Sequence, residues 1–128
     1  MTTAIGKVLS PNDTGETGSH QAGMLVPKSR QEVLDFFPPL NMAESKPLQS
    51  ITFIHDRDNT EYTFNFRYYR SKDEYHLTGM TEFFRVTGMR AGETLVLYRD
   101  GGRYYVSDAP PPGGLTPSGR NWAVVATD

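Results

Sequence analysis

The chain contains no cysteine among its 128 residues. This absence excludes a disulfide framework, a thiolate zinc site and a cysteine nucleophile, and it suits a reducing compartment. The sequence also has no apolar run that approaches the roughly 20 residues of a membrane-spanning helix. Residues Met1–Lys7 lack the basic and then apolar pattern of a signal peptide. We therefore expect a cytoplasmic protein that does not enter a membrane.

An excess of charge of either sign is also missing. The 13 Lys and Arg residues are nearly balanced by 15 Asp and Glu residues, and the formal net charge is −2. Such a chain has no overall attraction for polyanions. Any binding of nucleic acid would have to depend on local clusters of basic residues.

The common signatures of enzymes and metal sites are missing as well. The sequence has no Gly-x-Ser-x-Gly, no phosphate-binding Gly-x-x-x-x-Gly-Lys loop and no His-Glu-x-x-His. Its histidines, His20, His55 and His76, lie far apart without metal-ligand spacing, and we expect them at the surface or in turns. We predict no catalytic residue, no metal site and no cofactor.

What the chain does contain is material for one sheet-rich domain. A length of 128 residues is enough for one hydrophobic core but too short for two, so we expect 1–128 to form a single domain. Aromatic residues make up 12% of the chain and supply bulky core side chains. Its 12 glycines and 9 prolines separate short aromatic or β-branched runs, a pattern typical of strands with frequent turns.

Two hairpins are predicted from their turn residues, which are Asp, Asn and Gly. The paired strands are Leu48–His55 with Glu61–Tyr69, and Thr94–Tyr98 with Arg103–Ser107. Glu61–Tyr69 alternates strictly, so one of its faces is expected to lie in the core. That face carries Tyr62, Phe64, Phe66 and Tyr68.

Four further short runs are candidate strands: Ala4–Leu9, Gly23–Val26, Thr81–Val86 and Trp122–Ala126. About eight strands at this spacing are typical of a sandwich or a barrel. The Pro-rich and Gly-rich segment Ala109–Gly114 cannot form regular structure, and we interpret it as a linker before the last strand.

Helix is expected to be the minor component. Ser29-Arg30-Gln31-Glu32 is a capping box, which predicts a helix that begins at Ser29 and ends at Pro38-Pro39. Val33 and Phe37 lie four residues apart, so one face of this helix can dock on the sheet. Together these patterns predict a mainly β fold with one or two short helices.

Two stretches carry side chains suited to nucleic acid. Ser10–Gln21 is a long run of polar, Gly and Pro residues between two predicted strands. Such a loop lets the backbone approach phosphates, and its amide and imidazole side chains can reach base edges. Arg67–His76 interleaves basic and aromatic residues at a strand end, a mixture that suits phosphate binding with stacking. An ordinary flexible loop and a solvated strand end remain the alternatives from composition alone.

The first stretch contains three motifs in fixed register. Asn12-Asp13-Thr14-Gly15 is followed by Thr17-Gly18 and His20-Gln21-Ala22-Gly23, and then by Val26-Pro27 and the Ser29–Phe37 helix. This run strongly resembles the N-terminal effector-binding domain of EcoRII-type restriction endonucleases. Beyond the helix the resemblance is one of pattern. Arg70–Thr78 is similar to the family's second basic recognition segment, and Thr94–Ser107 is similar to its later hairpin.

The resemblance implies a DNA-binding pseudobarrel, a seven- to eight-stranded open β-barrel that plant auxin-response transcription factors share. In this family two arms contact the major groove of double-stranded DNA. The resemblance places one arm at Ser10–Gly23 and the other at Arg67–Thr78. It implies a target-recognition domain of a type II restriction endonuclease system, which does not cleave DNA by itself and works with a nuclease catalytic domain or subunit.

The resemblance also implies individual contacts. His20 falls on a DNA-contact position of the family, while Arg70, Lys72 and Glu74 keep the charge signs of family contacts. The complete set of residues predicted to bind DNA is Lys7, Asn12, Asp13, Thr14, Ser19, His20, Gln21, Leu25, Arg67, Arg70, Ser71, Lys72, Glu74, Tyr75 and His76.

Three of these positions depart from the family pattern. Tyr75 replaces a basic residue, His76 stands where an arginine is usual, and Leu25 stands where the family has a DNA-contacting tyrosine. An arginine bonded to guanine contributes roughly 1–3 kcal/mol of discrimination, which a histidine cannot reproduce in the same geometry. We therefore expect a target other than the family's CC(A/T)GG, or a preference for a modified base.

The leading hypothesis is a sequence-specific module for double-stranded DNA. A first alternative is a reader of modified DNA, in which a flipped or methylated base lies against Tyr68, Tyr69 or Tyr75. A second alternative, from another class, is a small-ligand or protein-interaction barrel that has lost the DNA-binding face.

Overall fold

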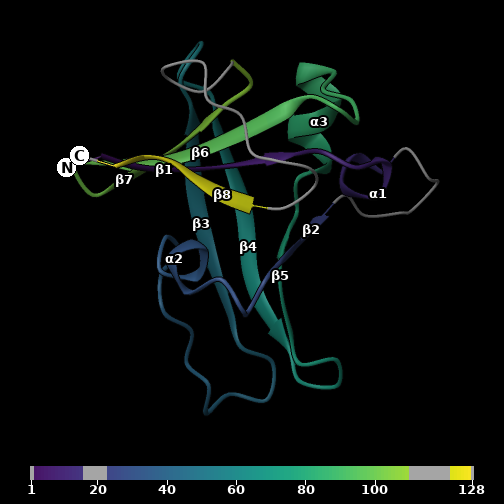
Figure 1. The fold of residues 1–128 in the computed structure, drawn as a ribbon, viewed down its shortest axis with the longest axis vertical. Helices are drawn as coiled ribbons and strands as arrows, with labels where there is room; N and C mark the ends of the chain where they lie inside the picture. The colour runs from purple at the N-terminus through teal and green to yellow at the C-terminus, as the bar shows by residue number, and fades with distance from the viewer. Residues whose placement is uncertain (1, 16–22, 110–121, 128) are drawn as a thin grey trace.

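Eight strands form one sheet in the order β2-β5-β4-β3-β7-β6-β1-β8 (Figure 1). The structure is a computed structural model that describes residues 2–15, 23–109 and 122–127. Neighbouring strands are antiparallel except β3 and β7, which are parallel. The elements are β1 Thr2–Val8, α1 Pro11–Thr14, β2 Gly23–Val26, α2 Gln31–Leu34, β3 Leu48–His55, β4 Glu61–Tyr69, β5 Glu74–Thr78, α3 Thr81–Thr87, β6 Thr94–Asp100, β7 Arg103–Ser107 and β8 Trp122–Thr127.

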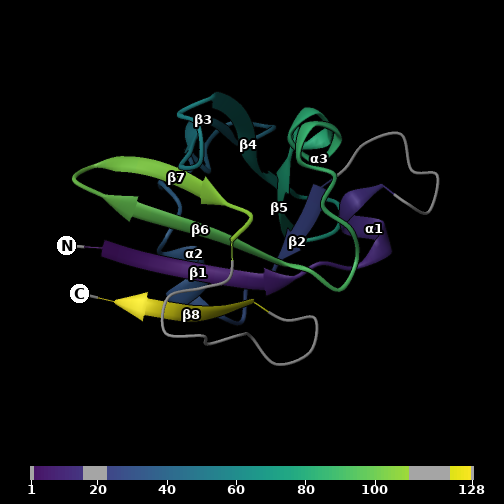
Figure 2. The same cartoon turned by 90° about the horizontal axis from the view of Figure 1, so that it is seen from above.

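The sheet curls into a barrel that strand pairing leaves open. Seen from above, β7, β6, β1 and β8 lie side by side and wrap around from β3 and β4 (Figure 2). Strands β2 and β8 are the two edges of the sheet. A side chain joins them, since Trp122 Nε1 of β8 donates a hydrogen bond to the carbonyl oxygen of Leu25 in β2 at 2.9 Å. The predicted fold class, a mainly β open barrel of seven to eight strands, is confirmed, although the described residues form three short helices where one or two were predicted.

The core of the barrel is aromatic. Phe53, Phe64, Phe83 and Trp122 are each at most 1% exposed. Phe53 and Phe64, on the paired strands β3 and β4, lie 5.0 Å apart between ring centroids. Phe83 of α3 meets the Phe64 ring edge-on at 5.9 Å. The inward aromatic face predicted for Glu61–Tyr69 is therefore confirmed for Tyr62, Phe64 and Phe66, whereas Tyr68 at its end is only half-buried and lines a surface cleft.

One predicted strand is wrong. Thr81–Val86 belongs to α3, and the eighth strand is β5, which the sequence analysis had assigned only to a recognition segment. Adjacent Phe83 and Phe84 are both buried, which a strand with one wet face does not permit. The helix ends at Gly88, whose φ of 70° is the left-handed conformation that favours glycine at a helix C-terminus.

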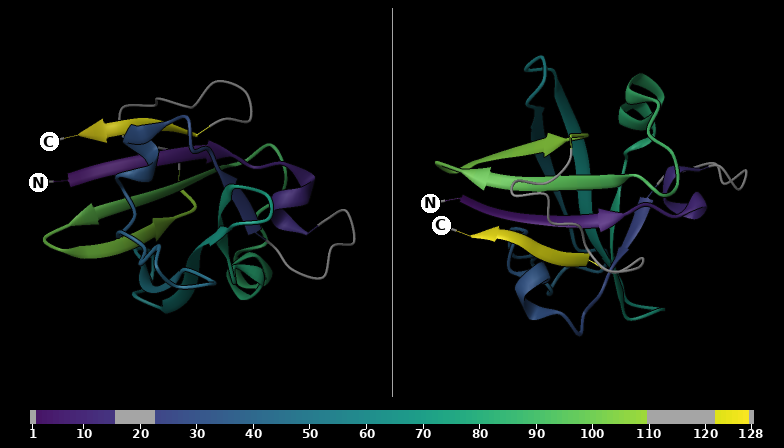
Figure 3. Two further views of the ribbon diagram at one scale, coloured as in Figure 1. Left: turned by 90° about the horizontal axis from the view of Figure 1, so that it is seen from below. Right: turned by 45° about the horizontal axis from the view of Figure 1, so that its top comes forward.

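The predicted capping box at Ser29 is also wrong. Helix α2 begins at Gln31 with Arg30 as its N-cap, and no side chain caps it. The Arg30 amide donates to the carbonyl oxygen of Pro27 at 3.2 Å, so Ser29 lies in a turn before the helix. Arg30 instead donates from its guanidinium to the carbonyl oxygen of Trp122 at 3.1 Å, which ties α2 to β8. Seen from below, α2 lies beside β8 (Figure 3).

Part of the predicted linker cannot be compared with the structure, because residues 110–114 lie outside the described residues. Within the described ranges, no helix has the length and apolar character needed to cross a membrane.

Replacing Trp122 by phenylalanine tests how the barrel is closed. Trp122→Phe keeps a large ring but leaves the Leu25 carbonyl without its donor, and we expect it to lower the free energy of unfolding by about 1–3 kcal/mol. Urea unfolding followed by circular dichroism measures this loss. Hydrogen exchange should also become faster in β2, the edge strand that this bond fixes.

Phe53→Leu is the matched control, because it removes core volume on a strand away from the barrel edges. It should destabilise the protein without a selective increase of exchange in β2. Equal exchange in β2 of the two variants would show that the Trp122 bond does not close the barrel.

Candidate nucleic-acid interface

A row of four side chains crosses the outside of the barrel. The register aligns Leu25 of β2, His76 of β5, Arg67 of β4 and Leu48 of β3. We call these residues the outer row. Their positions follow from strand alternation, since the neighbours of Leu25, for example, are buried. The outer row thus combines two cationic or titratable side chains with an exposed leucine at each end, 48% exposed at Leu25 and 40% at Leu48.

Two loops stand at opposite ends of the paired strands β2 and β5. Strand β2 begins at Gly23, near α1, and β5 begins at Glu74, directly after the turn 70–73. Because the two strands are antiparallel, α1 and this turn flank the outer row from its two sides (Figure 1). These loops belong to the two segments that the sequence analysis predicted as arms.

Helix α1 explains the sequence of the first motif. Ser10 is its N-cap and forms a reciprocal capping box with Asp13: the Asp13 amide donates to Ser10 Oγ at 3.3 Å, and the Ser10 amide donates to Asp13 Oδ2 at 2.8 Å. Pro11 occupies the first turn, where its missing N–H is not needed. Gly15 ends the helix at a φ of 83°. The motif therefore encodes a tight helical turn.

A buried ion pair fixes this turn to the barrel. The Lys7 ammonium group on β1 donates to the Asp13 carboxylate, and the two residues are only 6% and 5% exposed. Asp13 thus accepts from the capping amide and from a lysine at the same time. These hydrogen bonds replace contacts with water that the carboxylate loses on burial.

The turn 70–73 is fixed mainly by Asp73. Asp73 has a φ of 53°, an uncommon left-handed conformation that Asp tolerates. Its carboxylate accepts from the Lys28 ammonium group and from the Tyr68 hydroxyl. The hydrogen bond from Lys28, and then that from Tyr68, lower the pKa of Asp73, while the same bond raises the pKa of Tyr68. The carboxylate therefore stays ionised and holds both partners.

Arg70 joins this turn to the loop before β3. Its guanidinium donates to the carbonyl oxygens of Met42 and Glu44, the second at 2.7 Å. Between the loop and the turn lies a cleft of about 490 Å³, lined in part by Lys46, Arg67 and Arg70. None of the residues that line the cleft carries a carboxylate. The cleft is thus a positively charged hollow beside the outer row.

Two cationic side chains lie against the ring of Tyr69. Arg67 Cζ lies 5.8 Å and Lys72 Nζ 5.9 Å from the ring centroid. His76 meets the same ring edge-on at 4.9 Å, and its Nε2 lies 3.1 Å from Glu74 Oε1. Contacts with an aromatic face position cations without cancelling their charge.

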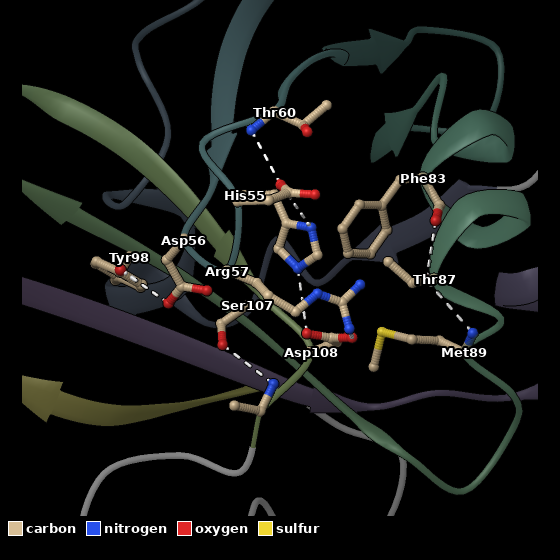
Figure 4. A network of polar contacts seen from close by, with 12 residues as sticks. His55, Asp56, Arg57, Thr60, Phe83, Thr87, Met89, Tyr98, Ser107 and Asp108 are labelled. Carbon is tan, nitrogen blue, oxygen red and sulfur yellow. Dashed lines mark hydrogen bonds and ion pairs between the residues drawn. The ribbon is translucent and has the colours of Figure 1, made fainter.

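His55 is buried, so its predicted place at the surface or in a turn is wrong. It ends β3, at the opposite end from Leu48, and its Nε2 lies 3.1 Å from Asp108 Oδ1 (Figure 4). Arg57 pairs with the same carboxylate at 3.2 Å. The cluster links the β3–β4 turn to the end of β7. Within the described ranges, no group of three or more His, Asp or Glu side chains is arranged so that it could hold a metal ion.

Residues 2–99 match the family model described as "Restriction endonuclease EcoRII, N-terminal". The chain belongs to this family. The match confirms the resemblance that was inferred from the motifs between Asn12 and Gly23, and it includes both loops of the candidate interface. Auxin response factor 5 of Arabidopsis thaliana is 35% identical to the chain over 97 residues, which are 73% of this chain and 10% of that protein. The chain thus spans about a tenth of the length of this relative.

Two solved structures have the same fold. One is described as an Arabidopsis FUS3–DNA complex; it is 23% identical, has a TM-score of 0.64, and the match covers 80% of this chain and 92% of that one. The other is the UbaLAI restriction endonuclease B3 domain with cognate DNA; it is 19% identical, has a TM-score of 0.67, and the match covers 97% of this chain and 86% of that one. Both likenesses confirm the pseudobarrel fold.

The structure brings many of the predicted contact residues together. Those on or beside the outer row and the turn are Leu25, Arg67, Arg70, Ser71, Lys72, Glu74 and His76. Asn12 and Thr14 lie on α1, where Asn12 is exposed. Tyr75 turns inward, and its ring stacks on Phe66 at 5.6 Å. Ser19, His20 and Gln21 lie outside the described residues.

Two residues predicted to contact DNA lie inside the protein. Two lysines near the candidate interface were absent from the predicted set. Lys7 and Asp13 pair with each other inside the protein. Lys28 and Lys46 were not predicted, although Lys28 holds Asp73 and Lys46 lines the cleft. Each is a single lysine beside a proline in the sequence, so only the fold places it among other cations.

The Lys7–Asp13 pair predicts the effect of a substitution on stability. Lys7→Met keeps most of the buried volume but leaves the Asp13 carboxylate without its cation, and we expect a loss of about 3 kcal/mol in the free energy of unfolding. Urea unfolding measures it.

Lys28→Met is the matched control, since it breaks a Lys–Asp pair whose side chains are both 57% exposed. Exposed pairs contribute little to stability because water screens them. Equal losses for the two variants would contradict a special role for the buried pair.

Proposed function

We propose that this chain is a sequence-specific module for double-stranded DNA and the target-recognition domain of a restriction system. In this proposal 1–128 is one domain, and the loop at α1 and the turn 70–73 enter the major groove on either side of the outer row. Membership of the EcoRII N-terminal family supports it. So do the descriptions of the structural relatives, a FUS3–DNA complex and a B3 domain with cognate DNA.

The observation that carries the proposal is the arrangement of charge beside the outer row. Arg67 and Lys72 lie against the ring of Tyr69, and Arg70 is bonded to main-chain carbonyl groups. These contacts leave the positive charges available to phosphates, although the whole chain has a net charge of −2. A local field of this kind is enough to attract the DNA backbone.

The proposal gives the side chains different tasks. Lys46 and Lys72 contact phosphates, which fixes the register of the protein on DNA. Arg67 and His76 face base edges, where guanine offers N7 and O6 as acceptors. Lys7 and Asp13 hold the first loop in position from inside the barrel. His20 contacts DNA from that same loop.

We assign no catalytic role to any residue of this chain. In our proposal strand cleavage in the restriction system is performed by a separate nuclease domain or subunit, and the protein acts on DNA in the cytoplasm.

The dependence of binding on salt tests the proposed function. For contacts with about five phosphates, the logarithm of the affinity should fall with the logarithm of salt concentration with a slope near −4 to −5. Fluorescence anisotropy with a labelled duplex, titrated over a salt series, gives this slope. A barrel that binds a neutral ligand or a protein through apolar contacts would show no such dependence on a duplex.

Single substitutions in the turn should weaken binding. Lys72→Ala removes one phosphate contact, so we expect lower affinity on all sequences and a salt slope that is less steep by about 1. Arg70→Ala should weaken binding more, because it also releases the loop that carries Met42 and Glu44. Arg103→Ala, an exposed arginine at the start of β7, is the control. Unchanged affinity in both turn variants would remove the second arm from the proposal.

His20 should affect the choice of sequence. We assign His20 to a contact with base edges. His20→Ala is therefore expected to change the set of duplexes recovered from a random pool, and to lower the affinity for the original target. An equal loss on every sequence would make His20 a phosphate contact instead.

A further inference from the structure

Leu25 differs in chemistry from the two polar members of the outer row, His76 and Arg67. It is an aliphatic side chain, 48% exposed, next to His76 on the paired strand. Glu74 and Thr78 share the outward face of β5 with His76, and Gly23 shares that of β2 with Leu25. Leu25 is therefore an apolar contact point beside groups that form hydrogen bonds, and Leu48 is the other apolar member, at the far end of the outer row.

The backbone at Leu25 is fixed by a hydrogen bond and by the packing of its neighbours. Its carbonyl oxygen accepts the hydrogen bond from Trp122, which is 1% exposed, and its neighbours Met24 and Val26 are buried. The Leu25 side chain thus projects from a backbone that is held by the buried side chains of its neighbours and by the hydrogen bond from Trp122. A rigid position matters, because a gap of 0.5–1 Å already removes a quarter to a half of a dispersion contact.

The outer row has the length of a short run of base pairs. Neighbouring strands lie about 4.8 Å apart, so Leu25 and Arg67, with His76 between them, are separated by about 10 Å of sheet. Successive base pairs are about 3.4 Å apart. The distance from Leu25 to Arg67 thus covers about three base-pair steps, so the three side chains can face bases within one short sequence.

The major groove offers an aliphatic side chain one apolar partner, the C5 methyl group of a pyrimidine. We propose that Leu25 is a specificity-determining residue that contacts the 5-methyl group of a thymine or a 5-methylcytosine, within the few base pairs that His76 and Arg67 face. This inference rests on the proposed function, because it concerns DNA bound on the outer row.

Methyl exchange on the DNA tests the inference. The probe is the duplex that wild-type protein selects from a random pool, and its affinity is measured by fluorescence anisotropy. In one set each thymine in turn is replaced by uracil, and in the other each cytosine is replaced by 5-methylcytosine. Burial of one methyl group changes affinity about fourfold. We expect one position at which wild-type protein loses this factor with uracil or gains it with 5-methylcytosine.

Leu25→Ala should abolish the methyl effect at that position, and Leu25→Ile should retain it. Val86→Ala is the control, because Val86 on α3 is 49% exposed but lies outside the outer row. Thermal unfolding verifies that each variant is folded. The uracil set identifies a thymine contact, and the 5-methylcytosine set identifies a contact with a modified base.

The outcomes separate the two proposals. If wild-type protein responds to methylation at no position, the inference is wrong while the proposed function stands. If Leu25→Ala keeps the full methyl effect, another residue makes the contact, and the inference is again wrong. If wild-type protein selects no duplex at all, the proposed function itself fails.

Discussion

The hydrogen bond from Trp122 to the Leu25 carbonyl decides the shape of the whole surface. Strand β2 pairs with β5 on one side only, and the sheet has no ladder between β2 and β8. In place of that ladder, the buried indole of Trp122 donates one hydrogen bond of 2.9 Å to β2. Arg30, the N-cap of α2, donates to the Trp122 carbonyl oxygen and so ties α2 to β8. With β2 fixed in this way, the distance between the two loops and the alignment of the outer row both follow. An open barrel thus presents a rigid face although its sheet is not closed.

Three cations near the outer row are held by neutral groups, whereas two arginines elsewhere are held by carboxylates. Arg85 of α3 pairs with Glu82, and Arg57 pairs with Asp108, so their charges are largely offset. Arg67 and Lys72 instead lie on an aromatic ring, and Arg70 on main-chain carbonyl groups. Rings and carbonyls orient a cation without carrying a full negative charge. A chain of negative net charge can therefore keep one face positive, which composition cannot reveal.

Local chemistry in the sequence was enough for most of the sheet. Strict alternation in Glu61–Tyr69 and the Asp and Gly residues of the turns predict β3, β4, β6 and β7, since register and burial there follow from neighbours in the chain. The prediction failed where contacts between residues far apart in the sequence determine the local structure or burial. Phe83 and Phe84 are strand-like residues that form a helix because it fills one end of the core. His55 is polar, yet Asp108, which directly follows β7, permits its burial.

In the candidate interface, too, the sequence alone does not show which contacts a single residue makes with distant parts of the chain. A family resemblance marks the positions that a family keeps, and a family keeps residues for support as well as for contact. Asp13 in the first motif caps α1 and pairs with Lys7 in the interior, whereas Asn12 beside it is exposed. From the sequence alone, both residues were predicted to bind DNA. Burial separates them, because a carboxylate enclosed with its lysine cannot reach DNA but can determine where its exposed neighbours stand. The position of the exposed residues of α1 therefore depends on a pair that is enclosed in the protein.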